Sequence, residues 1–218
     1  MKEIVMLYQS KNLNWYKPWD KRSLGLNIIG FMLIAIITAI FTVFFDIVLM
    51  EIGYIYIYFV LIFLMMVTYF FIVNVKTKGT ATFFFGLCGL MGIPIELIIE
   101  WQIANTLKSP WGALYWALIY VGYGLSIDLS LWLLKPARNE RKAVLNSSLI
   151  SSISIILLSI LAGATFYKTG LSVPGVDDFL THGYFMIPYS IIQGVMGGFL
   201  GWYIANNVLE KRVPMEDL

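Results

Sequence analysis

Six stretches of mainly apolar residues recur along the chain, and they constrain its fold more than any other feature. A helix needs about 20 apolar residues to cross a hydrocarbon core of roughly 30 Å, so each stretch predicts one transmembrane helix. The composition agrees, with 59% hydrophobic residues, 13% charged residues and a mean hydropathy of +0.79. We therefore predict an all-α membrane protein, a compact bundle of six transmembrane helices. The stretches lie near residues 25–45, 54–75, 79–99, 111–134, 144–167 and 184–208.

Lysine and arginine are concentrated in alternate loops between these stretches. Positively charged loops are retained in the cytoplasm, so their distribution predicts the orientation of the chain. Only Lys108 and Lys168 fall on the opposite side. Both termini are therefore expected to be cytoplasmic, in a multi-pass protein of the cell membrane. The basic residues assigned to the cytoplasm are Lys2, Lys11, Lys17, Lys21, Arg22, Lys76, Lys78, Lys135, Arg138, Arg141, Lys142, Lys211 and Arg212.

Three regions follow from this assignment. Residues 1–24 form a cytoplasmic N-terminal segment, residues 25–208 the six-helix transmembrane domain, and residues 209–218 a cytoplasmic tail. The first segment mixes aromatic residues with lysines. Aromatic rings favour the headgroup level and basic residues favour an anionic leaflet, so this segment is expected either to lie on the membrane surface or to be a loose tail.

Several function classes are disfavoured by what the sequence lacks. The small net charge of +2 and the dispersed basic residues argue against nucleic-acid binding. The single cysteine, Cys88, and the single histidine, His182, provide no disulfide and little basis for a metal site. The metalloprotease, serine-hydrolase and ATP-binding loop motifs do not occur. We therefore expect neither an enzyme nor a bound cofactor.

Two glutamates near the outer end of the third stretch are the strongest candidates for ligand binding. Glu96 and Glu100 are four residues apart, which places both carboxylates on one helical face, and Trp101 is adjacent. A carboxylate beside an indole can bind an organic cation through hydrogen bonds and cation–π attraction. These residues are therefore candidates for the mouth of an outward-facing pocket, and the alternative is that both carboxylates lie at the wet interface.

Other polar residues fall deeper in the predicted spans. Asp128 is 17 positions beyond Trp111, about 25 Å along a helix, and is expected toward the cytoplasmic side. A hydrogen bond to Ser126, Ser130 or a neighbouring helix is one interpretation of Asp128, and an unassigned role within the membrane is the other. Gln193 lies nearer the middle of the last span, where an amide can either join helices or recognise a ligand.

Small residues recur at four-residue spacing in two of the spans. Such spacing lets helices approach closely, but it does not distinguish contacts within the chain from contacts with another protein. The patterns are Ala35-x3-Ala39 in the first span and, in the last, Gly194-x3-Gly198 and Gly197-x3-Gly201.

The stretch from Lys76 to Leu134 contains KTKGTATFFFGLCGLMGIPIELIIEWQ and SPWGALYWALIYVGYGLSIDLSLWLL, and the last span reads IIQGVMGGFLGWYIANNVL. These segments resemble the YkoE-like substrate-binding S components of energy-coupling factor (ECF) transporters. Glu96 corresponds to the family glutamate, and residues 110–112 to the family loop. Tyr123, Gly124 and Asp128 stand where the family has Gln, Gly and Glu, and these departures leave the substrate open.

The resemblance implies a protein that captures a vitamin-like molecule, thiamine or its hydroxymethylpyrimidine moiety, at its outer face. Its partners would be a transmembrane coupling subunit, which Ala35 and Ala39 would meet, and ABC-type ATPases. The alternatives are a free-standing transporter or channel and a membrane assembly factor. The residues expected to contact the substrate are Glu96, Glu100, Trp101, Trp111, Tyr115, Tyr123, Tyr189 and Gln193.

Overall fold

The structure is a computed structural model that describes residues 16–48, 53–91, 111–136, 138–168 and 176–209. Within these ranges the chain is helical and forms no strand, apart from one isolated bridge between Lys17 and Thr77. Each helix coincides with one of the predicted apolar stretches. They are α2 (Lys21–Val48), α3 (Gly53–Val75), the helix Thr80–Met91, α5 (Trp111–Leu134), α6 (Glu140–Lys168) and α7 (Val176–Ile204), which continues into a π-helical turn, η1 (Ala205–Leu209).

Three of the described helices are long and apolar enough to cross a membrane, over Lys21–Ile40, Ala117–Leu134 and Glu140–Leu158. Leu61–Val75 and Thr80–Met91 are shorter apolar helices. Large apolar side chains cover the outside of these helices. On α2, for example, Ile29, Met32 and Ile40 are each at least half exposed. Exposed apolar patches of this extent are rare on soluble proteins. A surface of this kind is stable when it faces lipid.

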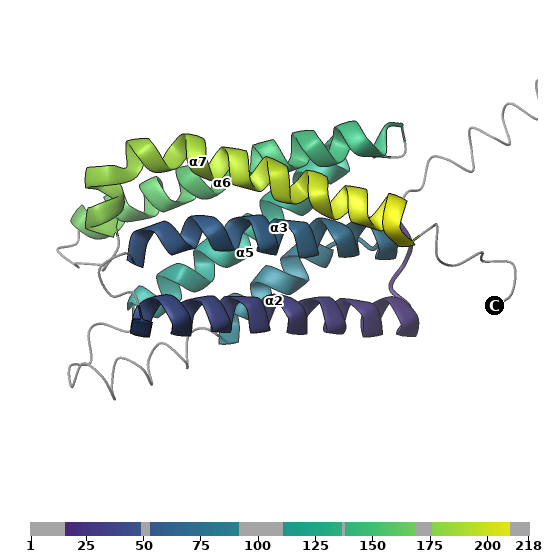
Figure 1. Ribbon diagram of the computed structural model, residues 1–218, viewed down its shortest axis with the longest axis horizontal. Helices are drawn as coiled ribbons and strands as arrows, with labels where there is room; N and C mark the ends of the chain where they lie inside the picture. The colour runs from purple at the N-terminus through teal and green to yellow at the C-terminus, as the bar shows by residue number, and fades with distance from the viewer. Residues whose placement is uncertain (1–15, 49–52, 92–110, 137, 169–175, 210–218) are drawn as a thin grey trace, which may run out of the picture.

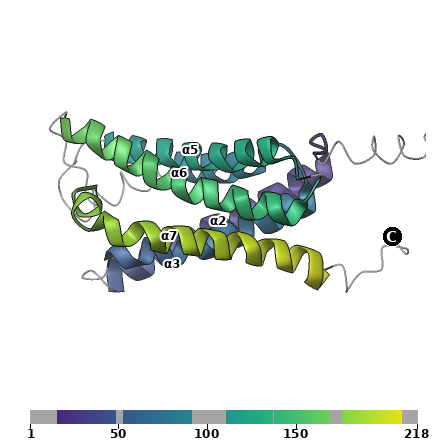
Figure 2. The same cartoon turned by 90° about the horizontal axis from the view of Figure 1, so that it is seen from above.

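The helices pack in two layers (Figures 1 and 2). Figure 2 shows α5 and α6 on one side of the bundle and α3 and α7 on the other, and α2 packs along α3 at the edge. The core between the layers is both apolar and aromatic. Its fully buried side chains include Ile34, Met65, Tyr69, Ile72, Phe84, Phe85, Tyr123, Ile127, Leu131 and Val144.

The glycines of α7 explain how it packs closely against both α3 and α6. A Cβ added at Gly197 or Gly201 would collide with the backbone of α3, at the carbonyls of Ile62 and Met66. One at Gly194 or Gly198 would instead meet serine side chains of α6. The two small-residue patterns therefore mark two faces of one helix, and each face contacts another helix of this same chain.

The residues just before α2 pack against the turn that follows α3. The backbone N–H of Lys17 donates to the carbonyl of Lys76 at 2.7 Å, and Nε1 of Trp19 donates to the carbonyl of Lys78 at 2.8 Å. The ring of Trp19 also contacts Phe83 edge-on, with 5.5 Å between centroids. Residues 16–20 thus form a strap across this end of the bundle.

A capping box then starts α2. The N–H of Ser23 donates to Oδ1 of Asp20 at 2.6 Å, and the N–H of Asp20 donates to Oγ of Ser23 at 2.8 Å. The hydrogen bonds from Ser23 hold the pKa of the Asp20 carboxyl below its ordinary value. α2 consequently begins at Lys21, a few residues before the predicted start of the first span.

Candidate functional site

The predicted ligand mouth lies largely outside the described residues. Glu96, Glu100 and Trp101 fall between the helix Thr80–Met91 and α5, in a part of the chain that is not described. Trp111 and Tyr115 belong to the first turns of α5, but their side chains lie outside the described set. The roles assigned to these five residues therefore stay predictions.

Gln193 lies in the interior of the bundle on α7. Its side chain is 6% exposed, and within the described part of the chain no donor reaches its Oε1. A buried acceptor without a partner costs about 1–3 kcal/mol, so its persistence needs a reason. Tyr189, one turn earlier on the same helix, is 36% exposed, while Ser190 between them is buried. α7 therefore presents a buried amide oxygen that is available to a donor.

Tyr123 belongs to the packed core. Its side chain is 1% exposed, its hydroxyl donates to Sδ of Met65 at 2.8 Å, and its ring contacts Phe85 with 4.9 Å between centroids. Tyr123 is therefore buried whereas Tyr189 is 36% exposed, and the substrate contacts predicted for both stay predictions. In this arrangement Tyr123 joins α5 to α3.

A cluster of hydroxyl groups continues this buried contact between helices. The hydroxyl of Tyr69 donates to Oγ of Ser147 at 2.7 Å, and Ser147 is 2.6 Å from Oγ of Ser130. Ser151, one turn along α6, is also fully buried. The cluster connects α3, α5 and α6 by side-chain hydrogen bonds, which join helices where no water competes.

Asp128 caps the helix that begins at Thr80. Its Oδ2 accepts hydrogen bonds from the N–H and the hydroxyl of Thr82, both at 2.7 Å, and its Oδ1 accepts one from the N–H of Ala81 at 3.3 Å. The first N–H groups of a helix have no partner within the helix, and a carboxylate there also interacts favourably with the helix dipole. The hydrogen bonds of Asp128 to the start of a neighbouring helix agree with the first of its two interpretations.

Glycine makes this capping contact possible. A Cβ at Gly124, one turn before Asp128, would lie 2.7 Å from the carbonyl oxygen of Ala81 and 2.8 Å from Cα of Thr82. Only glycine lets α5 come this close to the start of the helix Thr80–Met91. Tyr16 of the strap is packed nearby. Its burial, and secondarily the charge of Asp128, raise the pKa of the Tyr16 hydroxyl above its ordinary value.

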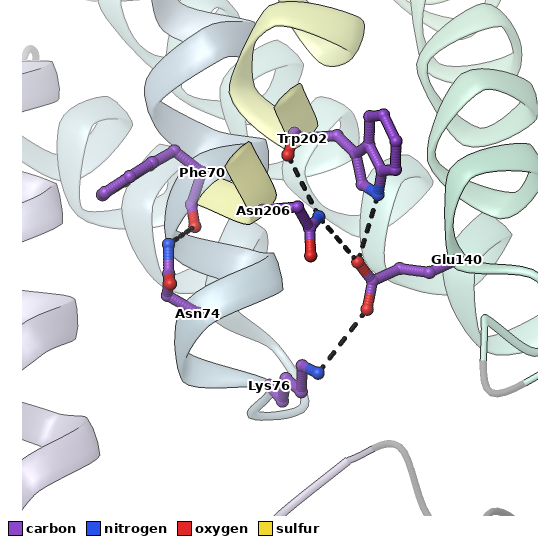
Figure 3. A network of polar contacts seen from close by, with 6 residues as sticks. All are labelled: Phe70, Asn74, Lys76, Glu140, Trp202 and Asn206. Carbon is purple, nitrogen blue, oxygen red and sulfur yellow. Dashed lines mark hydrogen bonds and ion pairs between the residues drawn. The ribbon is translucent and has the colours of Figure 1, made fainter. Parts of the chain in front are cut away.

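Glu140 is the centre of a second polar network, which the sequence analysis missed (Figure 3). Its Oε1 accepts hydrogen bonds from Nε1 of Trp202 at 3.1 Å and from Nδ2 of Asn206 at 3.0 Å. Its Oε2 is 3.5 Å from Nζ of Lys76. The network joins the end of α3, the start of α6 and the end of α7. A signal for it existed in the sequence, since Glu140 is the only acid in a basic loop.

We expect the Glu140 network to stabilise this end of the bundle through its hydrogen bonds more than through its ion pair. Glu140→Ala should lower the free energy of unfolding by about 2 kcal/mol, because the indole and amide donors lose a charged acceptor. Lys76→Ala should cost less than about 1 kcal/mol, because the Lys76 side chain is 35% exposed. Thermal unfolding in detergent measures both. Equal losses for the two variants would contradict this ranking.

The two alanines proposed for subunit coupling are four residues apart on α2 and differ in exposure. Ala35 is half-buried and Ala39 is exposed. Gly30, earlier on the same helix, packs directly against Phe71 and Phe84. The helix thus contacts the bundle with one side, while Ala39 lies on the part that the described chain leaves uncovered.

Comparisons with protein-family models, with curated proteins and with solved structures found no match to this chain. The structure alone therefore defines the class. The chain is a helical protein with at least three apolar helices of membrane-spanning length. Any statement of its activity rests on the residues described above.

Proposed function

We propose that this protein is the substrate-binding S component of an ECF-type importer, and that it captures thiamine or its hydroxymethylpyrimidine moiety from outside the cell. In this proposal six transmembrane helices cross the membrane and both termini are cytoplasmic. The first turn of α2 and the last turn of α7 lie at the same end of the bundle, which supports this orientation (Figure 1). The basic residues around 17–22, 76–78 and 135–142 adjoin helix termini at that end.

The observation that carries the ligand proposal is the unpaired amide oxygen of Gln193. An aminopyrimidine carries an exocyclic amino group that donates hydrogen bonds, and a buried acceptor recognises such a donor with high selectivity. Tyr189 supplies an aromatic ring one turn away on the same helix. The carboxylate of Glu96 would add a charged acceptor at the predicted outer mouth. A ligand of this kind satisfies Gln193, which the described protein groups leave unsatisfied.

The proposal also assigns the energy source to other proteins. The sequence contains no ATP-binding loop, so uptake driven by ATP requires separate ATPases and a coupling subunit. Ala39, which the described residues leave exposed on α2, supports a contact with the coupling subunit, because small residues let two helices approach closely.

The purified chain should bind thiamine or hydroxymethylpyrimidine, as measured by titration calorimetry and by thermal shift. Gln193→Leu should weaken binding at least about tenfold, because the leucine removes the acceptor. The same variant should unfold at an equal or higher temperature, since an unsatisfied buried group is replaced by an apolar one of similar size. Glu96→Gln should weaken binding by a similar factor.

Ser126→Ala is the matched control, since among the described residues its hydroxyl bonds only to the carbonyl of Tyr123 on its own helix. This variant should bind like the unmodified protein. The absence of both heat and thermal shift with either compound would refute the choice of substrate. Uptake by liposomes that contain this chain alone would instead favour a free-standing transporter, which needs no ATPase.

A further inference from the structure

One end of the bundle carries a strong excess of positive charge. Every lysine and arginine whose side chain the structure describes lies in the strap, in the first turn of α2, in the turn after α3, or from the end of α5 to the first turn of α6. Figure 1 shows that these segments meet at the same end. The residues are Lys17, Lys21, Arg22, Lys76, Lys78, Lys135, Arg138, Arg141 and Lys142.

The described carboxylates near these cations are Asp20, Asp128 and Glu140, which are too few to balance nine basic side chains. Asp20 caps α2, Asp128 caps the helix Thr80–Met91, and Glu140 bonds to α7 and to Lys76. Lys76 is the one described cation within ion-pair distance of a described carboxylate. The other basic side chains therefore leave this end of the protein attractive to anions.

Arg141 differs from the other cations because two aromatic rings fix its position. Its Cζ lies 5.6 Å from the ring centroid of Phe199 and 5.6 Å from that of Trp202. Glu140, next to it in sequence, is directed toward the indole N–H and the amide of Asn206 instead. The guanidinium is thus held at the junction of α6 and α7, and its planar set of donors matches a phosphate group.

An apolar face of α7 runs from this junction toward the middle of the bundle. Ile192, Met196 and Tyr203 are 56%, 50% and 47% exposed, and Phe199 completes the same helical face. The ring of Tyr203 lies 6.1 Å from that of Phe199. A fixed cation and aromatic rings at the end of an apolar helical face match a phospholipid, which has a charged head and an adjoining acyl chain.

We propose that Arg141, held against the rings of Phe199 and Trp202, binds the headgroup phosphate of an anionic phospholipid beside Tyr203, and that the lipid's acyl chain lies along Met196 and Ile192. Charge complementarity selects an anionic lipid over a zwitterionic one, and the apolar face selects a lipid over soluble phosphate. The site is separate from Gln193 and does not depend on what the protein transports.

Native mass spectrometry of the purified protein tests this proposal, with phosphatidylglycerol and phosphatidylcholine added in equal amounts. The unmodified protein should retain phosphatidylglycerol preferentially. Arg141→Gln should reduce that retention at least about fivefold, because one positioned cation is removed from the headgroup. Lys142→Gln removes the same charge one residue along, without the aromatic support, and should change retention less than about twofold.

Equal losses for the two variants would overturn the proposal, since the effect would then be one of net charge alone. A failure to prefer the anionic lipid would overturn it as well. Glycerol phosphate added as a soluble competitor should displace no lipid, and displacement would identify a soluble phosphate as the ligand instead. If Arg141→Gln fails to fold, the Arg141→Lys variant tests the role of the guanidinium in its place. It should lose the preference in part, and unchanged retention would refute the role of the guanidinium.

Discussion

Replacing Asp128 by alanine is expected to lower the free energy of unfolding by about 3 kcal/mol, because three hydrogen bonds to a charged acceptor are lost at once. The N–H groups of Ala81 and Thr82 would remain at the start of a helix without this acceptor. Ala81 is fully buried in the packed chain, and an unsatisfied buried backbone group is costly. The loss should appear as a lower unfolding temperature in detergent.

Asp128→Asn separates the charge of this residue from its shape. The asparagine keeps one acceptor oxygen for the helix start but loses the charge, so it should cost roughly half as much as alanine. Ser126→Ala, two residues away on the same helix, should change stability by less than about 1 kcal/mol. An Asp128→Ala protein as stable as Ser126→Ala would show that the cap contributes nothing to the fold.

Asp128 also shows how far the sequence could predict this fold. A hydrogen bond to a neighbouring helix was one of its two interpretations, based on the cost of a carboxylate in lipid, and its predicted depth stays a prediction. Its partners did not follow, because they depend on where a second helix begins. Thr80 starts that helix after a turn in which Gly79 adopts a φ of 78°, and Gly124 then allows the close approach. The turn at Gly79 and the close approach at Gly124 are both properties of the packed chain.

Glu140 was overlooked for a related reason. Counting loop charges treats each residue as solvated, whereas Glu140 is the first residue of α6 and is 22% exposed. Its partners Trp202 and Asn206 lie more than 60 residues away in sequence. The acid in a basic loop marks Glu140, but its partners come into reach only once α7 packs against α6, so no local pattern specifies them. The apolar stretches, in contrast, are local, because a membrane helix satisfies its own backbone.

The glycine patterns of α7 were recognised from spacing alone, but their partners were not. The three-dimensional arrangement assigns Gly197 and Gly201 to α3, and Gly194 and Gly198 to α6. The distinction affects stability, since a backbone neighbour cannot move aside whereas a side chain can change rotamer. A graded response to alanine is therefore expected across these positions.

Gly201→Ala and Gly197→Ala should each lower the free energy of unfolding by about 3 kcal/mol, at the upper end of the usual cost of overpacking. At Gly201 the new methyl group would meet the carbonyl of Met66 and lie 2.9 Å from the backbone nitrogen of Phe70. At Gly197 it would meet the carbonyl of Ile62 and lie 2.8 Å from Cβ of Met65. The double variant should fail to form the contact between α3 and α7.

Gly194→Ala should cost less, because its main obstacle is the hydroxyl of Ser152, which can rotate away. Gly25→Ala is the matched control on α2, where the added methyl group meets nothing within 4 Å. It should raise stability by about 0.5–1 kcal/mol, since alanine favours a helix more than glycine does. Unfolding temperatures of the four single variants measure this order. A destabilised Gly25→Ala together with an unaffected Gly201→Ala would contradict the packing of α7 against α3, since the backbone contact would then be absent.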